Sequence, residues 1–152
     1  MCSLELMKDS QFQIYVTKAI SSYASELIKS GEVPEKMADM EAKKAFYGLL
    51  PEGTKTLNQF LFNIVHENQQ IIGMIWYGLR PHQEGFIYDF EIDEVHRGKG
   101  YGKEALILLE AHAKSLGINK LGLRVFGHNE NAYALYKKMG YIPYSINMSK
   151  EI

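Results

Sequence analysis

Arg97-Gly98-Lys99-Gly100-Tyr101-Gly102 lies between an apolar-rich run, residues 86–92, and a helical pattern that begins at Lys103. Glycines at alternate positions free the backbone for conformations and close approaches that a Cβ would prevent. A loop of this kind that leads into a helix directs several unpaired N–H groups at one point, where the helix dipole adds partial positive charge. Arg97, Lys99 and Lys103 add full positive charges. The stretch therefore predicts an anion site suited to a phosphate or pyrophosphate.

The spacing of these glycines distinguishes the stretch from two common phosphate loops. A Walker A loop ends in Gly-Lys followed by Ser or Thr, whose hydroxyl binds magnesium. Here Glu104 follows Gly102-Lys103, and no glycine has the required offset. A dinucleotide-binding loop needs two residues between its second and third glycines, and Gly98, Gly100 and Gly102 lack that spacing. The pattern that fits is Arg-x-x-Gly-x-Gly after a strand.

The rest of the sequence predicts mixed strands and helices. Apolar residues at helical spacing precede Gly31, Gly117 and Gly140, which are typical helix-ending residues. Apolar or alternating runs between turn signals predict strands. The expected helices run from residue 9 or 10 to 29, over 35–50 and 103–116, and from residue 129 or 131 to 139. The expected strands are residues 3–7, 59–66, 70–79, 85–93, 120–126 and 142–148.

A second pattern follows the glycine loop after one helix and one strand. Asn129-Glu130-Asn131-Ala132-Tyr133-Ala134-Leu135-Tyr136 is followed by Gly140-Tyr141. Taken with the glycine loop, it resembles the signatures of the GNAT superfamily of N-acetyltransferases. These are an acyl-CoA pyrophosphate loop and an asparagine that leaves the fifth strand before a helix carrying a tyrosine. The resemblance extends over residues 86–141, whereas residues 1–80 carry no motif.

The resemblance implies a mixed α/β (α+β) fold in a single domain, residues 1–152. The expected core is a central mixed sheet of six to seven strands flanked by about four helices. Acetyl-CoA is the implied cosubstrate. Phe90, Glu91 and Ile92 would offer backbone groups to its pantetheine arm and polarise the acetyl carbonyl, and Asn129 would fix it through its amide. The pyrophosphate would be held by the glycine loop: Arg97, Gly98, Lys99, Gly100, Tyr101, Gly102 and Lys103.

Tyr136 and the acids of strand 85–93 are the candidates for proton transfer. The resemblance implies that Tyr136 is the general acid for the departing CoA thiolate, since a phenol with a pKa of about 10 is protonated at neutral pH. Without the resemblance, Tyr136 would be assigned as a core aromatic. Many family members carry an acidic pair in this strand, and here Asp89 matches the second acid while Tyr88 occupies the first position. Asp89 is therefore the first candidate for general base, Glu91 the second, and a chain of water molecules a third option.

Strand alternation and acidic clustering give two further expectations. Alternation would place Asp89, Glu91 and Asp93 on one face of the strand. The other face would carry Phe86, Tyr88, Phe90 and Ile92. Acidic residues of the first helical region could attract a cationic amine or simply form a solvated surface. They are Glu26, Glu32, Glu35, Asp39 and Glu41.

Composition limits the function classes. A net charge of −1 over 152 residues argues against general nucleic-acid binding. No apolar run approaches the length of a membrane span, and no signal-peptide core is present at the N-terminus. A single cysteine, Cys2, and five scattered histidines give no disulfide and no metal-ligand spacing. We therefore expect a cytoplasmic protein without metal, nucleic-acid or membrane partners.

These features predict an enzyme that moves an acetyl group from acetyl-CoA to a primary amine of a small molecule or peptide by direct transfer in a ternary complex. The acceptor is not defined by the sequence. A non-catalytic acyl-CoA-binding sensor and a nucleotide-phosphate enzyme of another class are the alternatives. The aromatic-rich tail, residues 141–148, could pack internally or across a homodimer.

Overall fold

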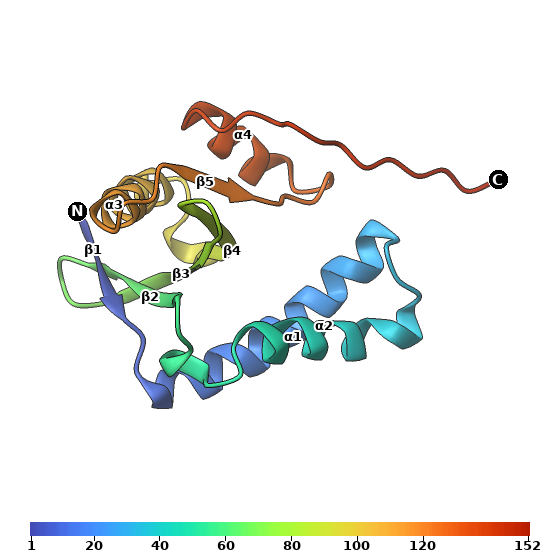
Figure 1. Cartoon of the computed structure of the whole chain (residues 1–152), viewed down its shortest axis with the longest axis horizontal. Helices are drawn as coiled ribbons and strands as arrows, with labels where there is room; N and C mark the ends of the chain where they lie inside the picture. The colour runs from blue at the N-terminus through green and yellow to red at the C-terminus, as the bar shows by residue number, and fades with distance from the viewer.

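Five strands form one mixed sheet in the order β1-β2-β3-β4-β5 in the computed structural model, which describes all residues, 1–152 (Figure 1). The first four strands pair antiparallel: β1 (Cys2–Leu6), β2 (Gln59–His66), β3 (Ile71–Arg80) and β4 (Glu84–Ile92). β5 (Lys120–Leu123) pairs with β4 in parallel, and the helix between them makes the crossover. The mixed sheet agrees with the expected fold, but the predicted count of six to seven strands is wrong.

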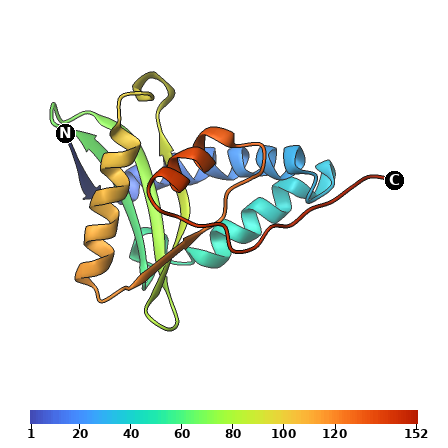
Figure 2. The ribbon, with the colours of Figure 1, turned by 90° about the horizontal axis from the view of Figure 1, so that it is seen from above.

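Four helices cover the two faces of this sheet (Figures 1 and 2). α1 (Asp9–Ser30) and α2 (Glu35–Leu49) lie on one face, and α3 (Tyr101–Ser115) and α4 (Glu130–Lys138) lie on the other. Gly31 ends α1 in the left-handed conformation, with φ of 76°, as predicted. Single 3₁₀ turns occur at Gly53–Lys55 and Glu94–His96. No helix combines the length and the apolar composition needed to span a membrane.

Two hydrophobic clusters join the helices to the sheet, one on each face. β3 contributes to both because successive side chains of a strand point to opposite faces. Met74 and Trp76 pack with α1 and α2, whereas Ile75 and Tyr77 pack with α3. All four side chains are buried, and burial of each stabilises the fold by about 1.5–3 kcal/mol. β3 is thus the central strand that fixes the position of its neighbour β4.

Residues 142–148 do not form the predicted final strand. Their apolar residues alternate as in a strand, but no residue after Tyr141 makes a backbone hydrogen bond. Pro143 lacks an N–H donor, and no other strand lies alongside. Alternation specifies which residues share a face, whereas a strand also requires a partner for its N–H and C=O groups. The sheet therefore ends at β5.

Candidate functional site

β4 and β5 pair over four residues and then separate. Glu84–Ile87 pairs with Lys120–Leu123, and β4 continues to Ile92 without a partner on that side. The last five residues of β4, 88–92, therefore have an open edge. The resemblance implies the acetyl thioester at this opening.

Contacts with α1 hold the chain away from β4 after Leu123. Side chains at alternate positions of residues 124–128 reach α1 or the turn that follows it. Arg124 pairs with Glu32, His128 bonds Glu26, and the rings of Phe126 and Tyr23 lie 6.2 Å apart between centroids. Since β5 ends where these contacts begin, α1 provides the physical cause of the opening.

The same contacts change the interpretation of the acid-rich first helices. Glu26 and Glu32 are engaged by basic side chains of this chain, and Asp39 pairs with Lys43 at 3.0 Å. These three carboxylates are therefore partly neutralised within the chain, which favours the alternative of a solvated surface over attraction of a cationic amine. Sequence composition reported their charge but not their partners.

Backbone groups of β4 alternate between β3 and the opening. The Asp93 N–H donates to Ile72 of β3 at 2.8 Å, so the N–H groups of Asp93 and Glu91 point toward β3. By alternation, those of Phe90 and Ile92 point toward the opening. Of the three strand residues expected to contact acetyl-CoA, two thus present N–H groups there and Glu91 does not.

The glycine loop adopts the conformation that its composition predicts. Gly98 and Gly100 have φ of 76° and 86°, in the left-handed region that other residues rarely adopt. Gly102 meets a different requirement: a Cβ there would lie 3.2 Å from Leu135 and 3.6 Å from Phe90. Its lack of a side chain therefore lets the start of α3 approach β4 and α4 closely.

This loop carries a run of unpaired donors. No backbone N–H from Gly98 to Lys103 donates to a backbone carbonyl. Lys99 and Lys103 are exposed and form no ion pair. Six N–H groups and two free ammonium groups at a helix N-terminus fit the charge of a pyrophosphate.

Arg97 joins the loop to the end of β4. Its Nε donates to the Ile92 carbonyl oxygen at 2.7 Å, and its guanidinium lies 3.4 Å from the Glu91 carboxylate. Both charged side chains are about half exposed, so the pair contributes little to stability. Glu91, the second candidate base, thus has a cationic partner in the loop.

Asp89, the first candidate base, accepts a hydrogen bond from Tyr15 of α1 at 2.6 Å between oxygens. Burial raises the pKa of this carboxyl above its ordinary value, and the Glu91 charge raises it further. The hydrogen bonds from Tyr15 and from the Phe90 N–H lower it in part. A largely buried carboxyl with a raised pKa is a candidate proton acceptor.

Tyr15 is the site residue that sequence reasoning missed. The sequence assigns it only to the apolar face of a helix, 74 positions from Asp89. Burial raises the pKa of its phenol, with the Asp89 charge second, so Tyr15 remains a donor. A tyrosine on the apolar face of a helix indicates a buried hydroxyl that requires a polar partner. The sequence does not specify which residue that partner is.

A β-bulge at Tyr88 overturns the expected alternation of β4. Asp89 pairs with Trp76 and Ile87 pairs with Tyr77, so Tyr88 is an extra residue between them. Tyr88 stacks on Trp76 at 4.8 Å between ring centroids, on the α1 and α2 face. It therefore shares a face with neighbouring Asp89 rather than with Phe90.

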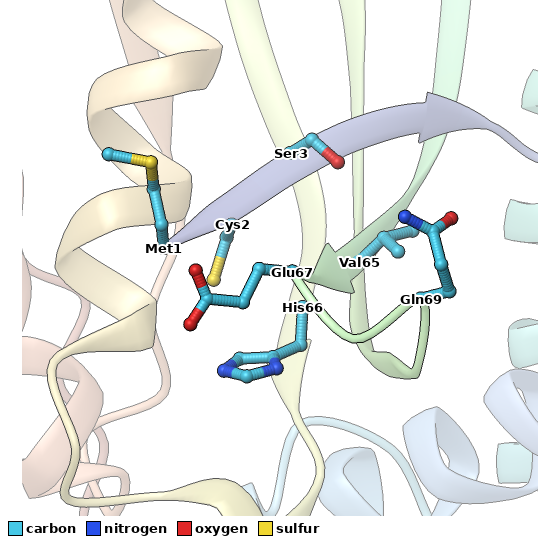
Figure 3. A pocket seen from close by; sticks show the side chains of 7 residues that line it. All are labelled: Met1, Cys2, Ser3, Val65, His66, Glu67 and Gln69. Carbon is cyan, nitrogen blue, oxygen red and sulfur yellow. The ribbon is translucent and has the colours of Figure 1, made fainter.

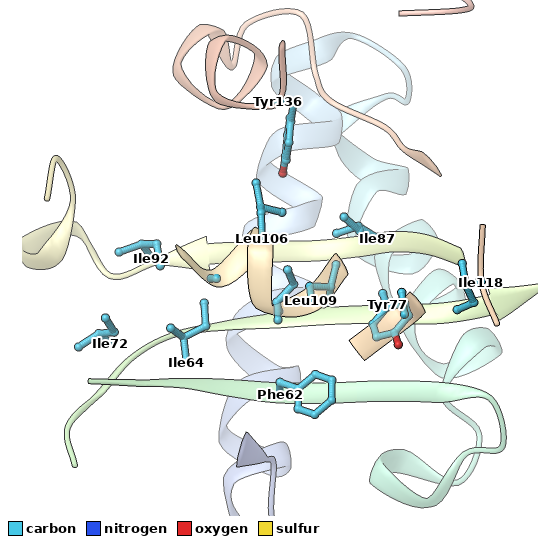
Figure 4. Packing of buried hydrophobic residues seen from close by; sticks show 13 residues of the cluster. Phe62, Ile64, Ile72, Tyr77, Ile87, Ile92, Leu106, Leu109, Ile118 and Tyr136 are labelled. Atoms are coloured by element: carbon cyan, nitrogen blue, oxygen red, sulfur yellow. The ribbon is translucent and has the colours of Figure 1, made fainter. Parts of the chain in front are cut away.

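Tyr136 extends from α4 toward the sheet above Leu106 (Figure 4). Its ring lies 6.4 Å from that of Phe90, and 9% of the residue is exposed. Burial, followed by the nearby Asp89 charge, raises its pKa to about 12. The hydroxyl has no protein hydrogen-bond partner yet is not sealed from solvent. Tyr136 thus belongs to the core and borders the opening.

Asn129 is the N-cap of α4. Its Oδ1 accepts from the Ala132 N–H at 3.4 Å, a contact that satisfies one free donor of the helix. Its amide NH₂ group forms no hydrogen bond with the protein. The structure therefore gives Asn129 a local capping contact and leaves two donors for the expected role toward the cofactor.

Cys2 lies closer to the motifs than its position in the sequence indicates. It borders a hollow of about 190 Å³ beside His66 and Glu67 (Figure 3), and its thiol donates to Glu104 of α3 at 3.3 Å. Burial and Glu104 raise its pKa to about 11, so the thiol is a poor nucleophile. No group of three or more His, Cys, Asp or Glu side chains is arranged to hold a metal ion.

Comparisons with known proteins agree with this geometry. Residues 22–141 match the acetyltransferase (GNAT) family, and the chain belongs to this family. It is 38% identical to the uncharacterized N-acetyltransferase YycN of Bacillus subtilis over 96% of both chains, and 35% identical to YdgE of the same organism over 99% of this chain and 98% of YdgE.

Solved structures show the same fold. The crystal structure of YycN aligns with a TM-score of 0.95 and 37% identity over 100% of this chain and 99% of YycN. The PaiA N-acetyltransferase of Thermoplasma acidophilum, solved in complex with coenzyme A, aligns with a TM-score of 0.70 over 97% of this chain and 93% of its own. At 15% sequence identity, this similarity concerns the fold alone.

Proposed function

We propose that residues 1–152 form one catalytic domain, active in the cytoplasm, that transfers an acetyl group from acetyl-CoA directly to a primary amine of a small molecule or peptide. The observation that carries the proposal is the opening between β4 and β5. It is bordered by Asp89 and Tyr136 and adjoins the loop of unpaired N–H groups. A proton acceptor, a proton donor and an anion site thus occur together.

The chain's own groups fit the charges and shape of acetyl-CoA. The Gly98–Lys103 N–H groups, with Lys99 and Lys103, would hold the pyrophosphate. The Ile92 N–H, together with the Phe90 N–H that Asp89 also uses, would bond the pantetheine arm and the acetyl carbonyl, and the free Asn129 amide would bond the arm. Arg97 would act mainly by fixing the loop to β4. The solved coenzyme A complex of a protein with this fold supports the ligand class.

When bound, acetyl-CoA supplies an activated acyl group on a thiol leaving group. Asp89 would take a proton from the ammonium of the acceptor, so that the neutral amine nitrogen can bond to the acetyl carbon. Tyr136 would donate its proton to the thiolate as the C–S bond breaks, and the second proton that the nitrogen loses when the amide forms would restore the Tyr136 hydroxyl. A pKa of about 12 keeps Tyr136 protonated at neutral pH. No covalent enzyme intermediate is required.

Asp89 is favoured over Glu91 as the base. Asp89 accepts a hydrogen bond from Tyr15, and burial raises its pKa above the ordinary value. Glu91 is exposed and paired with Arg97, so it has neither the burial nor the orientation that the role requires.

Thermal unfolding with and without acetyl-CoA tests the proposal, with ATP–Mg²⁺ and NAD as controls. A specific ligand at 100 times its dissociation constant stabilises a fold by about 2.7 kcal/mol. We expect a shift with acetyl-CoA alone, followed by thiol release with at least one member of an amine panel. A shift without turnover would favour the non-catalytic acyl-CoA-binding module, and a shift only with ATP–Mg²⁺ or NAD would refute the assignment of the loop.

A further inference from the structure

Arg80, the last residue of β3, carries a cation that no carboxylate of the chain neutralises. It lies directly opposite Glu84 in the register of β3 with β4, yet Glu84 forms its ion pair with Lys120 of β5 at 3.4 Å. Arg97 and Arg124 are each paired with a glutamate, whereas Arg80 is exposed and forms no ion pair. The charge of Arg80 is therefore free for a ligand.

Aromatic rings hold this guanidinium against the sheet. Its central carbon lies 3.7 Å from the centroid of the Phe86 ring and 5.6 Å from that of Tyr88. Gly122 of β5 lies opposite Phe86 and makes room for the ring, since a Cβ there would lie 3.3 Å from it. A guanidinium that rests on a ring keeps its N–H groups at its edge, where they match the two oxygens of a carboxylate. The rings thus position Arg80 for an anionic group of a ligand.

The same face of β4 leads from Arg80 to the proposed base. Phe86 lies opposite Gly78, two residues along β3 from Trp76, so it shares the α1 and α2 face with Tyr88 and Asp89. The Phe86 and Tyr88 rings lie 4.9 Å apart between centroids, and both residues are only half-buried. This face therefore presents, in order, a free cation, two partly exposed rings and the Asp89 carboxylate.

An acceptor that fits this order has its amine and a negative group at opposite ends of an apolar body. We propose that the acceptor is a primary amine with a carboxylate at the distance found in a dipeptide, and that Arg80 binds this carboxylate; the inference rests on the proposed acetyl transfer at Asp89. The apolar body packs on the Phe86 and Tyr88 rings. Arg80 repels an acceptor that has a second ammonium in place of the carboxylate, so polyamines are disfavoured.

The length of the acceptor follows from the rise of the strand. β4 advances about 3.3 Å per residue, so Asp89 lies roughly 10 Å along it from Phe86, over which the guanidinium sits. Contacts of about 2.8 Å at each end then leave between ~4 and ~10 Å from the amine to the carboxylate, according to their direction. One amino acid spans at most about 3.6 Å and an extended dipeptide about 7 Å. A dipeptide is therefore the shortest peptide that reaches both groups.

The affinities of glycyl-phenylalanine and of its C-terminal amide test the role of Arg80, with coenzyme A present in excess. Arg80→Gln is compared with Lys18→Gln, which removes another exposed cation without an ion pair. Calorimetric titration should show that the free acid binds about tenfold more tightly than the amide to the unmodified protein and to Lys18→Gln, through charge-assisted hydrogen bonds. In Arg80→Gln the two affinities should be equal.

Turnover with acetyl-CoA separates this inference from the proposed function. A preference for the free acid that Arg80→Gln abolishes, without acetylation of any amine, would support the carboxylate site and refute acetyl transfer. Acetylation with equal affinities for acid and amide would overturn the carboxylate site and leave the proposed function standing. Failure of both dipeptides to bind, or an Arg80→Gln variant that loses affinity for acid and amide alike, would also overturn the carboxylate site.

Discussion

Replacement of Tyr15 by Phe tests the role of Asp89 with a single atom. The change removes the hydroxyl that donates to Asp89 at 2.6 Å and leaves the ring among its aromatic neighbours. The centroids of Phe12 and Phe46 lie 6.4 and 6.5 Å away. The variant should therefore fold and bind acetyl-CoA as the unmodified protein does, which thermal unfolding with ligand would verify.

The expected effect follows from the charge on Asp89. A hydrogen bond to a charged group contributes about 1.5–3 kcal/mol, and about 1.4 kcal/mol corresponds to one pH unit in a titration. The bond from Tyr15 lowers the pKa of Asp89, whereas burial and Glu91 raise it. Without Tyr15 only the Phe90 N–H opposes the raising influences, so the pKa of Asp89 rises further. Because the base must be ionised, the acid limb of kcat/KM should move to higher pH by about one unit.

The assay is kcat/KM for any active amine from acidic to alkaline pH. On the acid limb Tyr15→Phe should be about tenfold slower, and well above the limb its rate should recover. Tyr23→Phe is the matched control, since it removes a hydroxyl from the same helix that makes no hydrogen bond. An acid limb that stays in place in Tyr15→Phe, or moves equally in Tyr23→Phe, would refute Asp89 as the base.

Three other substitutions test the remaining roles. Tyr136→Phe should lower kcat by about 10²-fold or more without weakening acetyl-CoA binding, and unchanged turnover would remove Tyr136 from the mechanism. Because the pKa of Tyr136 is about 12, the unmodified enzyme should keep its kcat/KM plateau to about pH 10. Gly100→Asp should weaken acetyl-CoA binding about tenfold, because a carboxylate ~6 Å from two phosphate charges in water repels them. The control is Gly117→Asp, which has similar backbone strain (φ of 79° against 86°) and should not change the affinity. Calorimetric titration with acetyl-CoA measures both affinities, and equal values would argue against the pyrophosphate loop. Asp89→Asn should abolish most activity yet raise the Tm at neutral pH. The pKa of Asp89 is higher in the folded state than in the unfolded state, so stability is lost as the pH rises from the lower of these values past the higher. A lower Tm for the variant at neutral pH in scanning calorimetry would contradict the destabilising effect of the buried charge.

The fold was largely predictable because its local signals agree with its global packing. The predicted helices and the first five predicted strands match the observed elements to within a few residues. Gly31, Gly117 and Gly140 all have positive φ at helix ends, as their positions indicate. Two predictions about strands were wrong for the same reason. The bulge at Tyr88 depends on the register with β3, and residues 142–148 remain unpaired for lack of a partner strand, so neither is specified by a strand's own sequence.

The two parts of the site differ in the same way. The glycine loop is local, since six residues carry the donors, the charges and the conformations that an anion needs. Its placement beside β4 depends on Gly102, where a Cβ would lie 3.2 Å from Leu135 and would require that side chain to shift. The groups proposed to transfer protons are far apart in the sequence. Tyr15, Asp89 and Tyr136 come from three elements, and no spacing in the sequence brings them together.

The half of the chain without a motif nevertheless builds the site. α1 and the turn that follows it contact residues 124–128, which diverge from β4 after β5, and α1 supplies Tyr15 to Asp89. A change in α1 would therefore act on both the width of the opening and the charge of the base. In the proposed mechanism the acceptor approaches Asp89 from the opening between β4 and the segment after β5. Amine selectivity in this chain should accordingly follow the residues of α1 that border the opening more closely than those of the glycine loop.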